Sequence, residues 1–384
     1  MSAGRSIFLY YLCGVFAAAQ LGKLAALAPL ISRDLHLGLA AMAALTSLLE
    51  VCGALLGGAA GRGLPRLGLR RALTLAVLSL ATGACVTAFA PTVALLAVAR
   101  LLESLGYLAI VVAAPVLVAR TAPAERQASA MALWSTFVPV GMAVGAWAYA
   151  HAAELSGWRW AQGLSVLAGV VLAAALHATR HTATDVMDRT ADLHAQRGQR
   201  TGALIWALVA AFGAYAVAEV GLLALLPTLL IQSGMTLAAA GTWTAVAALA
   251  NVPASFIGAW LMRRGGSLVW PIAVSLGVSG LMYGVTYHAD VAAAPKAAAA
   301  VVVNLFSGVF ATLVFALLPR VAGDASRLSL ASGRLTQFGA SGALIGPPLV
   351  GAVVEHLGWP AAGIVSLGLS ALAIAPAVWA WRRL

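Results

Sequence analysis

Long apolar runs, interrupted by short clusters of arginine, dominate this sequence and decide which solvent the chain can fold in. Only 9% of the residues are charged and 62% are hydrophobic, so too few polar side chains exist to cover a soluble globule of 384 residues. In lipid every backbone polar group needs a partner within the protein, and unbroken apolar runs fit helices rather than the alternating strands of a barrel. We therefore predict an all-α membrane protein.

About twelve runs are long enough to cross a hydrocarbon layer of about 30 Å at the helical rise of about 1.5 Å per residue. They fall near residues 6–31, 39–61, 71–90, 92–119, 126–153, 157–180, 202–232, 237–262, 267–288, 296–319, 328–354 and 359–381. The more polar segment 181–201 separates six runs from six. The sequence thus predicts an N-terminal six-helix bundle at 1–180, a cytoplasmic linker at 181–201 and a C-terminal six-helix bundle at 202–384.

The two predicted bundles carry an internal repeat. The pentapeptide at 154–158 returns at 355–359, so that one Glu-x-x-Gly-Trp pattern occurs twice at an offset of 201 residues. The same offset carries Arg62 onto Arg263, and each of these arginines follows a long apolar run. Internal pseudo-symmetry in a membrane chain is typical of secondary transporters, whose substrate sites lie between the repeats near the middle of the bilayer.

The distribution of positive charge predicts the orientation. Of the 23 basic residues, 17 fall in loops and tails on the side that holds both termini, 3 in loops on the other side and 3 within the apolar runs. Positively charged loops stay in the cytoplasm, so both termini are predicted there. The net charge of +11 then faces anionic lipid of the bilayer and requires no nucleic-acid partner. A composition rich in Arg and Ala and nearly free of Lys is typical of GC-rich bacterial genomes, which indicates a bacterial inner membrane.

The segment between the second and third runs resembles the signature of the major facilitator superfamily, roughly Gly-x-x-x-Asp-Arg/Lys-x-Gly-x-Arg/Lys-Arg/Lys. The matching positions are Gly57, Arg62, Gly68, Arg70 and Arg71. Gly61 stands at the acidic position, and the stretch 63–67 is longer than usual. Together with the six-plus-six arrangement, the resemblance covers essentially the whole chain. It implies the fold of that family, with Arg62, Arg70 and Arg71 at a cytoplasmic gate.

Two further segments resemble motifs of the same family. Residues 100–106, Arg-Leu-Leu-Glu-Ser-Leu-Gly, are similar to its membrane-embedded arginine motif, with Glu103 at a commonly polar position. Pro139-Val140-Gly141 followed by Gly145 resembles the antiporter motif only in part, and the run 346–351 is related to it. The spacing of Gly141 and Gly145 also predicts close packing between helices.

The resemblance implies that the first, fourth, seventh and tenth spans surround a central cavity. Each of these spans carries an unusual polar group: Lys23 with Gln20, Arg100 with Glu103, Glu219, and Asn304. Charged groups are costly in a bilayer, so they tend to face the interior of the bundle and mark transport pathways. We therefore predict Lys23, Arg100, Gln20 and Asn304 as substrate-binding residues.

Two cations and two carboxylates are predicted at one level of the N-terminal bundle. Lys23 and Arg100 lie near the depth of Glu50 and Glu103 when residues are counted from the predicted outer ends. One interpretation is a pair of permanent ion pairs that fasten the first, second and fourth spans together. The other is that an anionic substrate competes for the two cations and releases the carboxylates to take protons.

Glu219 has no cation in its own span or at its level of the C-terminal bundle. A carboxyl group so placed is expected to be protonated for much of the time, so Glu219 is the first candidate for the coupling proton, with Glu103 and Glu50 as competing sites. Arg334 enters the eleventh span by only about two turns and is predicted as an inner gate or a snorkelling residue. Gln337, Trp134 and Trp243 are candidates for the cavity wall.

Three functions fit these features. The favoured one is a secondary active transporter, coupled to protons, that moves a small organic anion or zwitterion by alternating access as a monomer. The alternative is a proton-driven exporter of amphipathic or toxic compounds, which two cavity cations, Lys23 and Arg100, disfavour if the compound is a lipophilic cation. The third, a polytopic membrane enzyme, lacks a catalytic cluster. No metal site, nucleotide loop or cofactor motif is found, so the proton gradient is the expected energy source.

Overall fold

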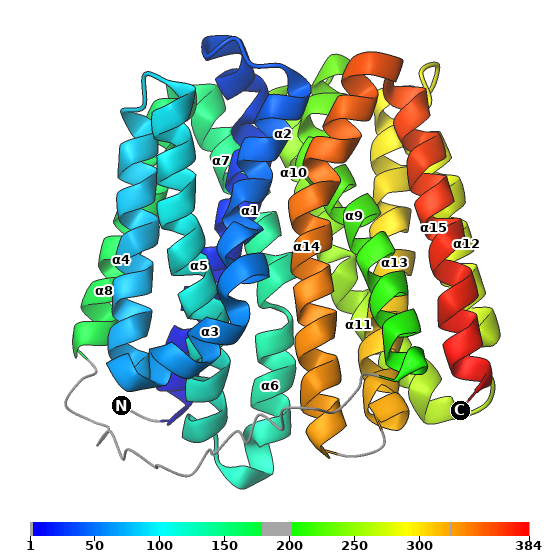
Figure 1. Ribbon diagram of the computed structural model, residues 1–384. Helices are drawn as coiled ribbons and strands as arrows, with labels where there is room; N and C mark the ends of the chain where they lie inside the picture. The colour runs from blue at the N-terminus through cyan, green and yellow to red at the C-terminus, as the bar shows by residue number, and fades with distance from the viewer. Residues whose placement is uncertain (1–2, 179–201, 323–324, 384) are drawn as a thin grey trace.

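The chain forms helices throughout the residues that the computed structural model describes, which are 3–178, 202–322 and 325–383 (Figure 1). In chain order these helices are α1 (Ala3–Asp34), α2 (Leu39–Ser47), η1 (Leu48–Glu50), α3 (Val51–Leu67), α4 (Leu69–Ala88), α5 (Val93–Thr121), η2 (Ala124–Arg126), α6 (Gln127–Ser135), α7 (Phe137–Ala161), α8 (Gly163–Ala178), α9 (Ala203–Gln232), α10 (Leu237–Leu249), α11 (Asn251–Arg264), α12 (Val269–Thr286), α13 (Ala293–Ala322), α14 (Ala325–Leu357) and α15 (Trp359–Arg382). The predicted all-α fold is confirmed.

Eleven stretches in the described ranges are long and apolar enough to cross a membrane. The remaining apolar helix, α8, has 16 residues, and its crossing starts earlier than its bounds suggest. Gly157, inside α7, has φ 81° and ψ 162°, so the chain changes direction there. The next crossing, which includes α8, therefore begins at Trp158. Gly358 has φ 83° and separates α14 from α15 in the same way. With α8 counted, the structure has the predicted twelve crossings.

The helices form two bundles side by side (Figure 1). Helices α1 to α8 make one bundle and α9 to α15 the other, and each has its own apolar core. Both chain ends lie on one face of the molecule, which we call the terminal face, and the other is the opposite face (Figure 1). The predicted linker 181–201 lies outside the described residues.

Glycines bring the first and fifth crossings of each bundle into close contact. A side chain at Gly145 of α7 would meet the backbone of Ala19 and Lys23 in α1. Gly346 of α14, found 201 residues later, meets the backbone of Val217 in α9 in the same way. The packing predicted from the glycine spacing in α7 is therefore confirmed, and it recurs in the second bundle.

The second crossing of each bundle is broken near its middle. The second crossing consists of α2, the short η1 and then α3, and the eighth consists of α10 and α11, which meet at Ala250. The sequence analysis treated both as continuous runs, since an apolar pattern has the same hydropathy whether or not the helix is interrupted. The two breaks lie at Glu50 and Asn251, which are 201 residues apart.

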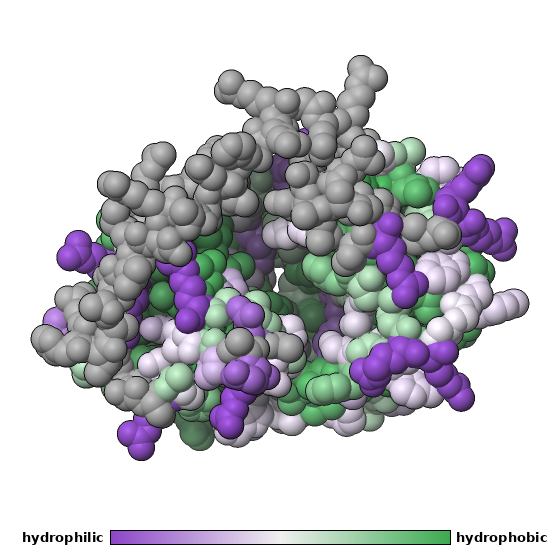
Figure 2. Space-filling view, turned by 90° about the horizontal axis from the view of Figure 1, so that it is seen from below, coloured by the Kyte–Doolittle hydropathy of each residue, from purple (hydrophilic) through white to green (hydrophobic). Residues whose placement is uncertain are grey.

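The bundles meet mainly through the segments of the broken crossings that lie toward the opposite face. Helix α2 packs against α14, and α10 packs against α7. By contrast, α11 packs mainly against α13 of its own bundle. Figure 2, which views the terminal face, shows a hollow between the bundles with mostly hydrophobic walls and hydrophilic side chains around the rim. The described structure is thus closed toward the opposite face and open toward the terminal face.

Candidate functional site

Three charged side chains meet in the interior of the first bundle. Lys23 of α1 donates from Nζ to Oε1 of Glu103 at 2.6 Å, and Arg100 of α5 donates from Nη1 to Oε2 of the same carboxylate. All three side chains are completely buried. One carboxylate therefore joins two cations and ties α1 to α5.

The break in the second crossing explains why Arg100 is held in this place. Where a helix is interrupted, backbone carbonyls lose their partners and must find others inside the protein. Arg100 donates from Nε to the carbonyl of Leu45 at 3.3 Å and from Nη2 to the carbonyl of Thr46 at 3.1 Å. Ser104, one turn further along α5, donates to the carbonyl of Leu49 at 2.8 Å. Side chains of α5 thus donate hydrogen bonds to the backbone carbonyls that lack helical partners where the second crossing is interrupted at η1.

Of the two interpretations of this layer, the one with two separate ion pairs does not describe the structure, because both pairs are made to Glu103. Glu50, in η1, belongs to none of the ion pairs in the described residues; its carboxyl group interacts with the hydroxyl of Tyr107 and, electrostatically, with Arg100. Two cations, Lys23 and Arg100, therefore share one carboxylate, Glu103, in the ion pairs, and these three groups carry one more positive than negative charge when all are ionised. The carboxyl group of Glu50 adds an electrostatic interaction with Arg100 but forms no ion pair with either cation. An excess charge of this kind in low dielectric favours an anionic partner.

Gln20 lies one turn before Lys23 but faces other helices. Its Nε2 donates to the carbonyl of Phe16 at 2.9 Å, and its Oε1 accepts a hydrogen bond of 3.1 Å from Ser165 of α8. Ser165 in turn bonds the hydroxyl of Tyr149 in α7. The structure therefore places the completely buried Gln20 in a network between α1, α7 and α8.

Glu219 of α9 is the centre of a polar cluster in the second bundle. Its Oε1 accepts a hydrogen bond of 3.0 Å from Nδ2 of Asn251, and the same Nδ2 lies 3.2 Å from Oδ1 of Asn304 in α13. The hydroxyls of Tyr215 and Ser307 also interact with the Glu219 carboxyl group. Among the described residues no cation pairs with Glu219, so its partners are neutral. Glu219 is 5% exposed and Asn304 is fully buried.

Asn251 is a member of this cluster that the sequence analysis missed. It lies at the first position of α11, directly after the break in the eighth crossing. The repeat contains a signal for it, because the offset of 201 residues carries Glu50 onto Asn251 and Glu103 onto Asn304. Both positions therefore hold a carboxylate in the first bundle and an amide in the second.

The two candidate tryptophans have different surroundings. Trp134 of α6 is buried in the core of the first bundle, where it stacks on Phe137 at 4.4 Å between ring centres and packs on Gly14 of α1. Trp243 of α10 is half-buried and packs against the apolar core of the second bundle. The hydroxyls of its neighbours Thr242 and Thr244 bond backbone carbonyls of their own helix. In the described part of the chain, neither indole forms a hydrogen bond or a cation–π contact with the buried charged residues.

The predicted gate residues lie toward the terminal face. Arg334 of α14 is half-buried, with its guanidinium 5.4 Å from the ring centre of Trp206 in α9 and 3.5 Å from the amide oxygen of Gln337, which is exposed. Arg70 is half-buried and Arg71 exposed in the first turn of α4. The side chain of Arg62, in α3, lies outside the described part of the structure.

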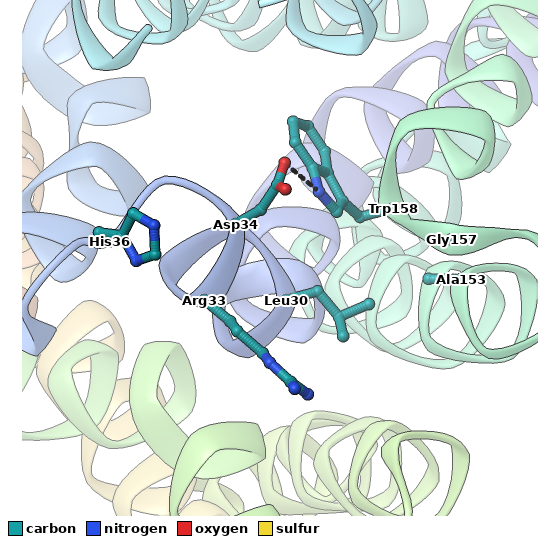
Figure 3. Close-up of a pocket in the computed structure, with 7 residues that line it drawn as sticks. All are labelled: Leu30, Arg33, Asp34, His36, Ala153, Gly157 and Trp158. Atoms are coloured by element: carbon teal, nitrogen blue, oxygen red, sulfur yellow. Dashed lines mark hydrogen bonds between the residues drawn. The ribbon is translucent and has the colours of Figure 1, made fainter. Parts of the chain in front are cut away.

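Two pockets lie on the opposite face, away from the buried charges. The one in Figure 3 has a volume of about 460 Å³ at the end of α1, where Asp34 accepts a hydrogen bond of 3.3 Å from the indole of Trp158. The other, of about 410 Å³, lies at the end of α9, where Trp359 donates to Gln232 at 2.8 Å. The repeated Glu-x-x-Gly-Trp pattern thus fixes each tryptophan to the first helix of its bundle. The described residues contain no group of side chains suited to a metal ion.

Comparison with known proteins agrees with this architecture. The family model of the Major Facilitator Superfamily matches residues 10–294. A comparison with curated proteins gives no match. Among solved structures, two crystal structures of a bacterial homolog of the human lysosomal transporter Spinster, in different conformations, are similar to this chain, with 15% sequence identity in each. The inward-facing, occupied form has a TM-score of 0.82 and covers 99% of this chain and 97% of that chain, and the inward-facing, unoccupied form has a TM-score of 0.75 and covers 99% and 95%.

These similarities and the residues above lead to one family. The twelve crossings, the repeat at 201 residues, the hollow between two bundles and the match over 10–294 are all found together in one polytopic membrane chain. At 15% identity the solved structures support the fold alone. The family model covers well over half of the sequence and therefore supports membership of the family. The chain belongs to the Major Facilitator Superfamily and is one of its membrane transporters.

Proposed function

We propose that this transporter couples the movement of a small organic anion or zwitterion to the movement of protons. The observation that carries the proposal is the surplus positive charge of the buried cluster in the first bundle, where Lys23 and Arg100 share Glu103. An incoming carboxylate or phosphate would satisfy the charge that Glu103 alone leaves uncompensated. Of the two cations, Lys23 is the more available, because Arg100 also bonds the carbonyls of Leu45 and Thr46.

The proton site of the proposal is Glu219. Its partners are uncharged side chains, those of Asn251, Tyr215 and Ser307. Within the described residues no cation forms an ion pair that would stabilise the ionised carboxylate. A buried carboxyl group with neutral partners can change its protonation when the conformation or the solvent access changes. Glu103 is the competing site, but it would have to leave two cations to take a proton.

The experiment uses purified protein in liposomes with an imposed pH gradient and a panel of radiolabelled organic anions. Glu219→Gln is expected to keep exchange of substrate across the membrane and to lose accumulation driven by the gradient. Glu103→Gln tests the competing site, because it removes the other buried carboxylate of a cavity helix; since this variant is expected to be less stable, transport is compared at equal amounts of folded protein. If Glu219→Gln still concentrates substrate and Glu103→Gln does not, the proton site lies in the first bundle and the assignment is wrong.

One observation favours export of amphipathic compounds as a second candidate. The visible walls of the hollow on the terminal face are mostly hydrophobic, so they suit a substrate with a large apolar part (Figure 2). An amphipathic anion would satisfy both the apolar walls and the surplus charge. Export of lipophilic cations by the protein, unchanged in Lys23→Met, together with no transport of the organic anions, would favour the exporter without an anion site.

We further propose that the transporter works as a monomer in a bacterial inner membrane, with both termini in the cytoplasm and without a bound cofactor. The orientation is supported by the excess of arginine in the loops of the terminal side, where 17 of the 23 basic residues fall. In that orientation the hollow of Figure 2 opens to the cytoplasm.

A further inference from the structure

We propose that Glu355 is a positioning residue for the transport cycle: it caps helix α2 of the other bundle and thereby holds the transporter closed toward the opposite face. Glu355 lies near the end of α14, in the second copy of the Glu-x-x-Gly-Trp pattern. Its Oε2 accepts a hydrogen bond of 3.2 Å from the backbone N–H of Ala40. The inference uses the family's alternating access and rests on neither the proposed substrate nor the proposed proton site.

Helix α2 needs a cap from elsewhere. The first N–H groups of a helix have no partner within it, and a side chain at the N-cap position usually supplies one. Here the N-cap residue is Gly38, which has no side chain to do so. A carboxylate in this position also interacts favourably with the positive end of the helix dipole. Glu355 therefore supplies the hydrogen-bond acceptor at the start of α2 that a serine or aspartate at position 38 would otherwise supply.

The close approach of the two helices makes room for this contact. A side chain on Gly38 would collide with the carboxylate of Glu355. One turn earlier on α14, a side chain on Gly351 would press on the backbone of Leu39 and Ala40. Because α2 and α14 belong to different bundles, the hydrogen bond from Ala40 to Glu355 links the bundles as well as capping a helix.

The repeat provides an internal comparison. Glu154 is the equivalent of Glu355, and Gly241 of α10 packs against Ala150 of α7 as Ala40 of α2 does against Gly351 of α14. Within the described residues, however, the exposed carboxylate of Glu154 makes no hydrogen bond or ion pair.

The reason lies at the start of α10. That helix begins with its own cap, since the side chain of Thr236 accepts a hydrogen bond of 3.2 Å from the N–H of Ala239. In the numbering of the repeat, α10 starts about one turn earlier than α2, so Gly241, the equivalent of Ala40, already lies inside the helix. Only one of the two repeated glutamates therefore joins the bundles.

The contact must break during transport. In alternating access the bundles separate on one side and close on the other, and any interaction made only in the closed form shifts the equilibrium toward it. Separation on the opposite face removes the carboxylate from α2 and leaves its first N–H groups to water. The bond from Ala40 to Glu355 thus favours the form that is open to the terminal face.

The test measures the distance between the bundles on the opposite face in the full-length protein. Spin labels are attached to cysteines that replace Phe89, at the end of α4, and His288, after α12, both exposed, in a background where the exposed Cys85 is serine. Pulsed electron paramagnetic resonance on the protein in nanodiscs then gives the distribution of distances between the two labels, in which long distances report the form open toward the opposite face. Glu355→Ala is expected to raise the population open toward the opposite face about 3- to 10-fold, as the loss of a helix cap implies.

Glu154→Ala is the matched control and is expected to leave the distance distribution unchanged. Glu355→Gln keeps the shape of the side chain but offers a weaker, uncharged hydrogen-bond acceptor. It should therefore shift the distance distribution by an intermediate amount. This variant also serves as the test if the alanine variant does not fold. Equal distributions for Glu355→Ala and Glu154→Ala would overturn the proposal.

A second variant separates the cap from the link between bundles. Adding Gly38→Ser to Glu355→Ala gives α2 a cap of its own in the space that the carboxylate has left. We expect this pair to regain thermal stability while the distance distribution stays shifted. If Gly38→Ser also restores the distribution, Glu355 acts only as a local cap, and the proposal is wrong.

Discussion

Replacing Glu103 by glutamine should destabilise the protein far more than replacing Lys23 by methionine. Glu103→Gln removes the one carboxylate that forms ion pairs with the two completely buried cations, Lys23 and Arg100, and removing one partner from a buried ion pair costs about 3–5 kcal/mol. Lys23→Met removes the surplus cation and leaves Arg100 and Glu103 as a balanced pair. The apolar stem of methionine fills much of the space of the lysine, so a loss of about 1 kcal/mol or less is expected.

The measurement is equilibrium unfolding in mixtures of mild and denaturing detergent, followed by tryptophan fluorescence, with wild type and both single variants side by side. The double variant is the internal check, because adding Lys23→Met to Glu103→Gln removes one of the two unpaired cations and should recover part of the lost free energy of unfolding. If Lys23→Met loses as much free energy as Glu103→Gln, or if the double variant is less stable than Glu103→Gln, the assignment of a surplus positive charge is refuted.

Two further predictions concern orientation and packing. A reporter enzyme fused after Leu384 should be active only in the cytoplasm, and activity on the outer side alone would contradict the proposed topology. Gly145→Ala should lower the free energy of unfolding by about 1–3 kcal/mol because its methyl group would press on the backbone of Ala19 and Lys23 in α1. Gly277→Ala is the control, since the structure has open space there, and a helical alanine should then be neutral or stabilise by up to about 1 kcal/mol. Equal losses for both glycines would contradict the argument from close contact.

The crossings could be read from the sequence because hydropathy and length decide them. Apolar runs of the right length fix which segments lie in lipid, and the repeat at 201 residues fixes how the two groups of six correspond. That Lys23, Arg100 and Glu103 lie at one level also followed from depth, since each residue of a helix advances by a fixed rise, but depth did not decide which of the charged groups pair.

The contacts that depend on rotation and on local backbone could not be read in this way. Depth placed Glu50 in the same layer as the cations, but depth did not show that Glu50, at the η1 break, interacts with the hydroxyl of Tyr107 and forms no ion pair with Arg100. That break also explains the bonds of Arg100 to Leu45 and Thr46, which no pattern of side chains predicts. Asn251 was overlooked because a single amide in an apolar run has little effect on hydropathy, although comparison of the repeats would have marked it.

The exchange of carboxylates for amides between the repeats has an evolutionary consequence. A gene duplication gives both halves the same starting residues, yet positions 50 and 103 now hold acids while 251 and 304 hold asparagine. The first half has kept a cluster whose charges compensate one another only in part, and the second has a neutral scaffold around one acid contributed by a different helix, α9. The descendants of one ancestral segment have thus become specialised, so that exchanging the two halves in an engineered chimera would not give an equivalent transporter.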